Sequence, residues 1–148
     1  MNVNNLFHVK ISNNIDVFSN MINILKQMPN ESNNNILHMK ITCPEINDKT
    51  IYMTTCNKNI IIKIKLIRES FCEFYCDSSE LKFSVNLQIF CDCLKNINQN
   101  NNLIMYIEKY DEKLTVEINN EHSGTKSVHK LDINIDDVET KHKIIEVK

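Results

Sequence analysis

Apolar and polar residues alternate along much of the chain, and this is the period of a strand with one buried face. In the first such segment, residues 6–12, Phe7, Val9 and Ile11 share one side. Short polar turns separate the further strands that the pattern predicts, at 36–43, 50–55, 59–67, 70–76, 81–86, 103–109, 113–119 and 125–133. The most hydrophobic of these, 59–67, is expected to be buried on one face and partly covered on the other.

Two segments, 16–28 and 87–97, have the three- and four-residue period of an amphipathic helix. Asp16 is the candidate N-cap of the first helix, and Pro29 ends that helix. Matched apolar stripes predict that the helices pack side by side on one face of an antiparallel sheet. The side chains expected to be buried there are Val17, Met21, Phe90 and Leu94.

Length and charge favour one soluble, intracellular domain. The chain has 148 residues, enough to bury roughly two-thirds of its unfolded surface. It has neither a signal-peptide pattern nor an apolar run long enough to span a bilayer, so we expect no membrane partner. The formal net charge of -2 argues against a domain that coats nucleic acid with its whole surface. Any DNA contact must therefore be local.

No residue pattern typical of an active site is present. A single glycine cannot build a phosphate-binding glycine loop, and the five histidines have no neighbouring nucleophile. A thiol dyad of Cys76 with a distant histidine is possible, but a core cysteine on a sheet-forming strand is the favoured interpretation. Asp136, Asp137 and Glu139 lack the spacing of a calcium loop. We expect no enzymatic activity and no cofactor.

The cysteines also offer no local metal site. Cys72 and Cys76 lie about 13 Å apart along one predicted strand, and Cys91 and Cys93 point roughly 200° apart around a helix. Neither pair can chelate one ion. The six cysteines are therefore interpreted as reduced, small hydrophobic residues.

Three short motifs follow one another between residues 71 and 95. They are Phe71-x-x-Phe74-x-Cys76, Ser84-Val85-Asn86-Leu87 and Leu94-Lys95. Their order and spacing resemble the sliding clamps of the PCNA family, in which an aromatic-x-x-aromatic-x-Cys strand leads to a Gly-Val-Asn-Leu strand end and a short helix finishing in Leu-Lys. Ser84 replaces the glycine. The order of the predicted elements, a βαβββ unit written twice, is also that of one PCNA domain.

The resemblance implies an α+β DNA clamp fold with two four-stranded antiparallel sheets and two helices packed on them. It assigns residues 7–136 to a single clamp domain of the N-terminal-domain type and residues 137–148 to the start of an interdomain-linker-like tail. The second domain of a full clamp protomer is missing. A composition rich in Asn, Ile and Lys is typical of an AT-rich genome and suggests a viral or protist source. The expected location is the nucleus, or a cytoplasmic replication site for a viral protein.

For function, the resemblance implies a DNA polymerase processivity factor. In the family, six such domains close a ring that double-stranded DNA threads without base-specific contacts, with the helices on the inner wall and polymerases or other client proteins outside. The residues that correspond to the DNA-facing positions are Asn20, Asn23, Lys26 and Lys95. Ser19, Asn20 and Asp92 stand where the family is usually basic, so we expect weaker, more salt-sensitive DNA binding. A role for both lysines as ordinary solvated residues is equally open.

The resemblance also implies two protein contacts. The final strand corresponds to the sheet edge through which a clamp subunit of the family pairs with its neighbour. In this chain we expect that edge to pair with a second copy or a second clamp domain, through Ser127, Val128, His129, Lys130 and Leu131. In the family, client peptides dock between the interdomain linker and a loop after the third strand. The corresponding residues of this chain are the tail and Thr54, Thr55, Cys56, Asn57 and Lys58. The apolar tail residues Ile144, Ile145 and Val147 either cover a hydrophobic pocket there or belong to a truncated strand.

A second hypothesis is a PCNA-like domain that no longer forms a ring and acts as a protein-interaction or assembly module. The missing second domain and the small number of basic residues on the helices favour it. A fragment of a longer gene product is a third possibility.

Overall fold

A computed structural model describes residues 4–12, 15–27, 36–43, 49–57 and 60–135 of the chain. Within them lie nine strands, two α-helices and one short 3-10 helix, and every strand and α-helix expected from the sequence period is present. In chain order these are β1 (Asn5–Ile11), α1 (Ile15–Lys26), β2 (Ile36–Thr42), β3 (Thr50–Asn57), β4 (Ile60–Leu66), η1 (Arg68–Ser70), β5 (Phe71–Cys76), β6 (Glu80–Asn86), α2 (Leu87–Leu94), β7 (Asn101–Glu108), β8 (Lys113–Asn120) and β9 (Thr125–Ile135).

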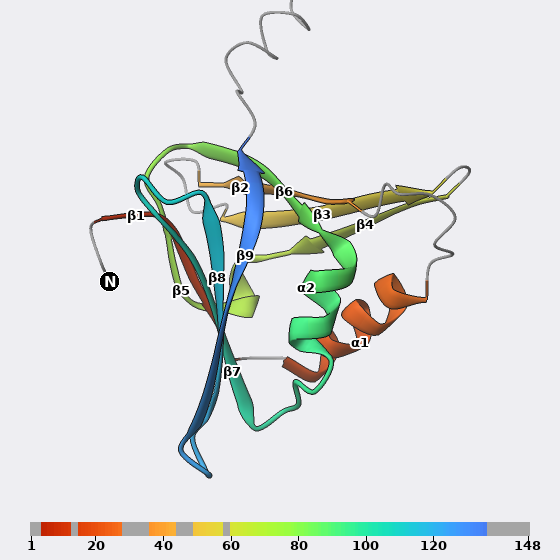
Figure 1. Cartoon of the computed structure of the whole chain (residues 1–148), viewed down its shortest axis with the longest axis vertical. Helices are drawn as coiled ribbons and strands as arrows, with labels where there is room; N and C mark the ends of the chain where they lie inside the picture. Colours follow the sequence, from red (N-terminus) through yellow and green to blue (C-terminus); the bar gives the residue numbers. More distant parts are fainter. Residues whose placement is uncertain (1–3, 13–14, 28–35, 44–48, 58–59, 136–148) are drawn as a thin grey trace, which may run out of the picture.

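The strands form one antiparallel sheet in the order β4-β3-β2-β6-β9-β8-β7-β1-β5. Strand β9 joins its two halves (Figure 1). From Thr125 to Asp132, β9 pairs with β8, and from Ile133 to Ile135 it pairs with β6. The two four-stranded sheets implied by the family resemblance are thus continuous through β9, and β4 and β5 are the outer edges.

The two half-sheets and the helices share one apolar core. Phe7 on β1 and Phe83 on β6 connect the halves, with ring centroids 6.4 Å apart. Both helices lie side by side on one side of the sheet (Figure 1), and Ser19 Oγ donates a hydrogen bond to the carbonyl oxygen of Ile97 at 3.3 Å. The predicted burial of Phe90 and Leu94 on α2 is confirmed.

The predicted inward face of α1 is partly wrong. Val17 is 46% exposed, and Met21 is only half-buried. The buried stripe consists of Ile15, Phe18, Ile22 and Leu25. Seven apolar residues crowd this helix, more than one inward stripe can hold, so the sequence does not decide which of them face solvent.

The prediction for the most hydrophobic strand, now β4, is also partly wrong. Ile64 and Leu66 are buried as expected, whereas Ile61 on the opposite face is 73% exposed. Ile61 lies on the face of β4 opposite the core, together with the exposed Lys63 and Lys65, and β4 is also the last strand of the sheet. Hydrophobic density along a strand does not distinguish an edge from a centre.

The junction between β6 and α2 explains why a strand can run straight into a helix here. Asn86 ends β6 and is the N-cap of α2, where its Oδ1 accepts a hydrogen bond from the Ile89 amide at 2.9 Å. Asp16, expected to be the cap of the first helix, instead lies inside the first turn of α1, which begins at Ile15. A carboxylate there still interacts favourably with the helix dipole. Pro29 lies outside the described residues.

The cysteines divide into two groups. Cys91 is buried, and Cys76 is half-buried against the core, where burial raises the pKa of its thiol. Cys56 and Cys72 are exposed. The interpretation of all six as small hydrophobic residues is therefore wrong for these two, because their side chains point away from the core.

Candidate functional site

The residues expected to face DNA all lie in the helix layer. Asn20 and Asn23 are exposed on α1, and Lys26 is the last residue of that helix. Lys95 is exposed and follows α2 directly. Since the helices pack side by side, these four positions belong to one layer of the molecule (Figure 1).

This layer contains acidic residues as well as lysines. Asp16 and Asp92 are exposed on α1 and α2, and Asp92 Oδ1 accepts a hydrogen bond from Gln88 Nε2 at 3.1 Å. Large apolar side chains are exposed on the same helices, at Val17, Ile24 and Ile89. The exposed carboxylates of Asp16 and Asp92 lower the attraction of this layer for a phosphate backbone.

The residues expected at a subunit interface lie on the part of β9 that pairs with β8 alone. Ser127, Val128, His129 and Lys130 are exposed there, with Val128 at 49%. Leu131 differs, because its side chain is 3% exposed and belongs to the core. On the side away from β8, the β9 backbone from Thr125 to Asp132 has no strand neighbour among the described residues.

Carboxylates of the neighbouring segment pair with the lysines of this edge. Lys126 Nζ lies 2.7 Å from Glu117 Oε1, and this hydrogen bond raises the pKa of Lys126. Lys130 Nζ lies 4.0 Å from Asp111, and Lys113 pairs with Asp132. Such exposed pairs contribute little to stability. They do reduce the local positive charge, which lowers the cost of bringing another strand to this edge.

A hollow of about 480 Å³ lies between the end of α2 and the β8–β9 hairpin. It brings together residues predicted for two different roles, since Lys95, Ser127 and His129 all line it. Burial raises the pKa of Cys93, which also lines the hollow. The DNA-facing and interface predictions therefore meet at one place in the fold.

Sequence reasoning missed the opposite edge of the sheet. Beside β4, a second hollow of about 370 Å³ is lined by residues from α1 and from the end of β4, including Val17, Met21, Lys65 and Ile67. Ile67 is 47% exposed and Val17 46%. The sequence signal for this edge is an excess of apolar residues, which by itself predicts burial.

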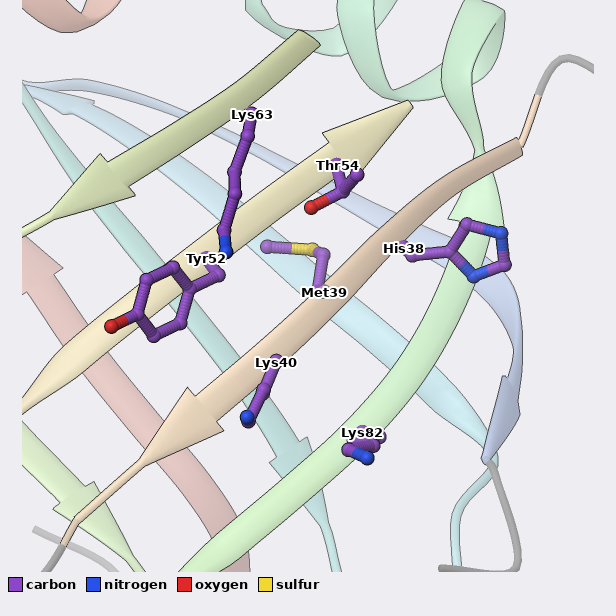
Figure 2. Close-up of a pocket in the computed structure, with 7 residues that line it drawn as sticks. All are labelled: His38, Met39, Lys40, Tyr52, Thr54, Lys63 and Lys82. Atoms are coloured by element: carbon purple, nitrogen blue, oxygen red, sulfur yellow. The ribbon is translucent and has the colours of Figure 1, made fainter. Parts of the chain in front are cut away.

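The segment expected to bind client peptides belongs mostly to β3. Thr55 is buried, and its Oγ1 donates a hydrogen bond to the Ile36 carbonyl oxygen at 3.0 Å. Cys56 is exposed, and Thr54 lines a hollow of about 330 Å³ (Figure 2). Asn57 ends β3, and Lys58 and the tail lie outside the described residues. Thr54 and Cys56 are thus the two side chains of this segment that the structure makes accessible to a ligand.

Neither a metal cluster nor a membrane-spanning helix is found in the part of the chain that the structure describes. No group of three or more His, Cys, Asp or Glu side chains in these residues is placed to hold a metal ion. None of the described helices is long and apolar enough to cross a membrane.

Comparison with known proteins identifies the architecture. No protein-family model matches the chain, and no curated protein matches it significantly. Among solved structures, PCNA from Thermococcus kodakaraensis superposes with a TM-score of 0.66 at 15% sequence identity. The fold is that of the PCNA clamp. The α+β clamp architecture implied by the sequence motifs is therefore confirmed.

The extent of the match is unequal in the two proteins. It covers 86% of this chain and 46% of the Thermococcus PCNA chain. This chain thus spans about half the length of that clamp protein.

Proposed function

We propose that this chain is a subunit of a DNA sliding clamp, which acts as a processivity factor and is not an enzyme. The observation that carries the proposal is that the first part of β9 and the outer side of β4 are both free strand edges on a PCNA fold. A ring needs further copies or a second clamp domain, because this chain spans only about half of the PCNA chain it resembles.

The two edges suit a head-to-tail contact. The unpaired stretch of β9 runs from Thr125 to Asp132, and β4 runs from Ile60 to Leu66, so their lengths are similar. An edge with unpaired backbone groups readily accepts another strand. Each edge also has a hollow beside it, which the side chains of a neighbouring copy could fill. A heterologous contact of this kind generates a ring when the rotation closes.

In such a ring the helix layer faces the DNA, and the exposed face of β2, β3 and β4 remains available to client proteins. Lys26 and Lys95 supply the positive charge of the helix layer, and Asp16 and Asp92 oppose it. Retention on DNA then depends on encirclement more than on electrostatic attraction, which so few lysines supply only weakly.

A second candidate function is a clamp-like module that binds proteins without forming a ring. The observation that favours it is the nearly neutral helix layer with exposed Val17, Ile24 and Ile89. A surface that need not face DNA is free to carry apolar residues, which are common at protein contacts.

Native mass and DNA topology together separate these functions. The 17.4 kDa chain is measured by native mass spectrometry over a range of concentrations, and it is then assembled in the presence of nicked circular DNA. A ring predicts a closed multimer, six copies if the chain acts alone, that stays on circular DNA and leaves when the DNA is linearised. A monomer at all concentrations, with equal retention on both DNA forms and no second clamp domain as partner, would support the module instead.

A further inference from the structure

Two rows of side chains cross the outward face of β2, β3, β4 and β6. In the first row, Lys82, Lys40, Tyr52 and Lys65 occupy directly opposed positions on adjacent strands. The second row holds Ser84, His38, Thr54 and Lys63. The rows share a face because their members lie two residues apart along each strand. Figure 2 shows most of these side chains around one hollow.

Tyr52 lies at the centre of this surface. Its ring centroid is 4.8 Å from Lys63 Nζ, 5.7 Å from Lys65 Nζ and 5.9 Å from Lys40 Nζ. Ammonium groups at these distances are attracted by the face of an aromatic ring. The hollow beside Tyr52 has a volume of about 330 Å³ and is also lined by His38, Thr54 and Lys82. We refer to Lys40, Lys63, Lys65 and Lys82 as the lysine cluster.

The lysine cluster is poorly neutralised within the described chain. Glu80 Oε1 lies 3.3 Å from Lys82 Nζ and 3.8 Å from Lys40 Nζ, so one carboxylate serves two ammonium groups. For Lys63 and Lys65, no carboxylate of a described residue lies within 4.0 Å. The β8–β9 hairpin differs, because each of its lysines Lys113, Lys126 and Lys130 has its own acidic partner. Like charges opposite one another in a sheet are destabilising, so the cluster has a cost in stability that Glu80 offsets only in part.

Protection of the sheet edge does not explain the whole cluster. Lysines on an edge strand prevent unwanted pairing, and Lys63 and Lys65 are on β4, which is an edge. Lys40 is on β2, which has strands on both sides and needs no such protection, and Lys82 lies on β6 next to the three residues that pair with β9. Their placement opposite each other requires another explanation.

The limits of the cluster indicate what kind of anion fits it. Four adjacent strands span roughly 14 Å, the length of about four extended residues. Beyond the second row, the outward positions are Ile36, Cys56 and Ile61, with Ile36 39% and Ile61 73% exposed. On the other side lie Thr42 and Glu80. A nucleic-acid backbone would leave the positive charge after a few phosphates and reach apolar side chains or a carboxylate.

We infer that the lysine cluster binds a short acidic peptide segment of a partner protein, with an apolar residue next to the acidic ones. The carboxylates of the segment face Lys40, Lys63, Lys65 and Lys82, and its apolar side chain packs beside Ile36 and Ile61. Charge complementarity supplies specificity and speed of encounter, and the apolar contact supplies additional affinity. This site lies on the exposed sheet face and does not require a closed ring.

The test is a fluorescence anisotropy titration with a labelled peptide of four glutamates followed by two leucines. One comparison peptide has glutamine in place of each glutamate, and a single-stranded oligonucleotide of the same charge tests the nucleic-acid alternative. The variant Lys63→Gln/Lys65→Gln removes two charges from the cluster. Its matched control is Lys10→Gln/Lys109→Gln, which removes two charges from the other half-sheet, where Lys10 lies opposite Glu73 and Lys109 pairs with Asp77.

We expect the glutamate peptide to bind at low salt, the glutamine peptide not to bind, and the cluster variant to lose about tenfold in affinity while the control keeps it. Thermal melts of both variants establish that they are folded. Equal binding of the two peptides, or equal losses in the two variants, would overturn the proposal. Tighter binding of the oligonucleotide, lost in the same variant, would assign the surface to nucleic acid instead. Because anisotropy reports peptide binding and native mass reports assembly, this inference and the proposed function fail separately.

Discussion

Lys40 on β2 and Lys82 on β6 lie directly opposite each other, and their ammonium groups are 3.8 Å and 3.3 Å from one shared oxygen of Glu80. The Glu80 side chain is 27% exposed, so solvent screens this contact only in part. A single carboxylate thus holds together two like charges that would otherwise repel across the sheet.

The first prediction follows from this arrangement. Glu80→Gln should lower the free energy of unfolding by about 0.5–1 kcal/mol at low salt, because it leaves the two lysines unscreened. The loss should shrink at high salt. Chemical denaturation at two ionic strengths measures it. Adding Lys82→Gln to this variant should recover most of the lost unfolding free energy. If the losses of the two single variants simply add in the double variant, the explanation is wrong.

The second prediction concerns the packing of α2. Leu94 is 1% exposed in the core, whereas Ile89 on the same helix is 52% exposed. Leu94→Ala should cost about 2–5 kcal/mol of unfolding free energy, since it leaves a cavity. Ile89→Ala should cost little. Urea denaturation of the two variants tests this, and a loss below about 0.5 kcal/mol for Leu94→Ala would mean that the helix is placed wrongly.

The third prediction tests the free part of β9. The Ile133 amide donates to the Glu112 carbonyl oxygen at 3.4 Å, toward β8. Because backbone direction alternates along a strand, the His129 amide also points toward β8 and the Val128 amide points to the free edge. Val128→Pro should therefore block assembly and leave the monomer folded.

His129→Pro is the matched control for this edge. It removes a bond from the β8–β9 ladder, so it should destabilise the monomer itself. Sedimentation velocity reports assembly, and circular dichroism reports folding. Assembly of Val128→Pro at the wild-type level would exclude β9 as the contact.

The fourth prediction concerns the helix layer. Lys26→Glu/Lys95→Glu should weaken retention on DNA uniformly across sequences and lower the salt dependence by about one counterion per lysine. Stability should change little, because surface charges contribute little to folding. Filter binding at several salt concentrations measures the slope. If the double variant is retained at low salt as well as the wild-type protein, these two lysines do not face the DNA.

The fifth prediction compares two residues with left-handed backbone conformations. Tyr110 has φ 68° in the turn after β7 and is fully exposed, and Gly124 has φ 71° in the turn before β9. Tyr110→Asn should raise the free energy of unfolding by up to about 1 kcal/mol, because asparagine tolerates this conformation better. Gly124→Ala should lower it by about 1 kcal/mol. Thermal denaturation of both variants checks the signs, and the same sign for both would refute the argument.

The strands and helices could be predicted from the sequence because each depends on local periodicity. Residues 81–86 alternate and residues 87–97 do not, and the structure changes from β6 to α2 at Asn86. The motifs around this junction therefore predict the correct fold. Asn86 is itself the residue whose cap allows the change.

Contacts between strands distant in the sequence could not be predicted in the same way. Lys40, Lys65 and Lys82 form one row only because of the registers of three separate strand pairs. A shift of one residue in any pair would turn a lysine to the other face. The edge position of β4 likewise depends on strand order, and the orientation of α1 depends on which of its many apolar residues find space in the core.

Among the described strands, β9 is the last to leave the ribosome and the one that bonds to both half-sheets. When synthesis has passed Gly124, both helices and eight strands have been made, but the strand that joins the halves has not. During that interval the facing edges of β6 and β8 are open, and open edges accept any suitable strand. The β9 of another incompletely folded copy of this chain matches these edges in sequence, so domain swapping competes with correct closure until β9 has paired.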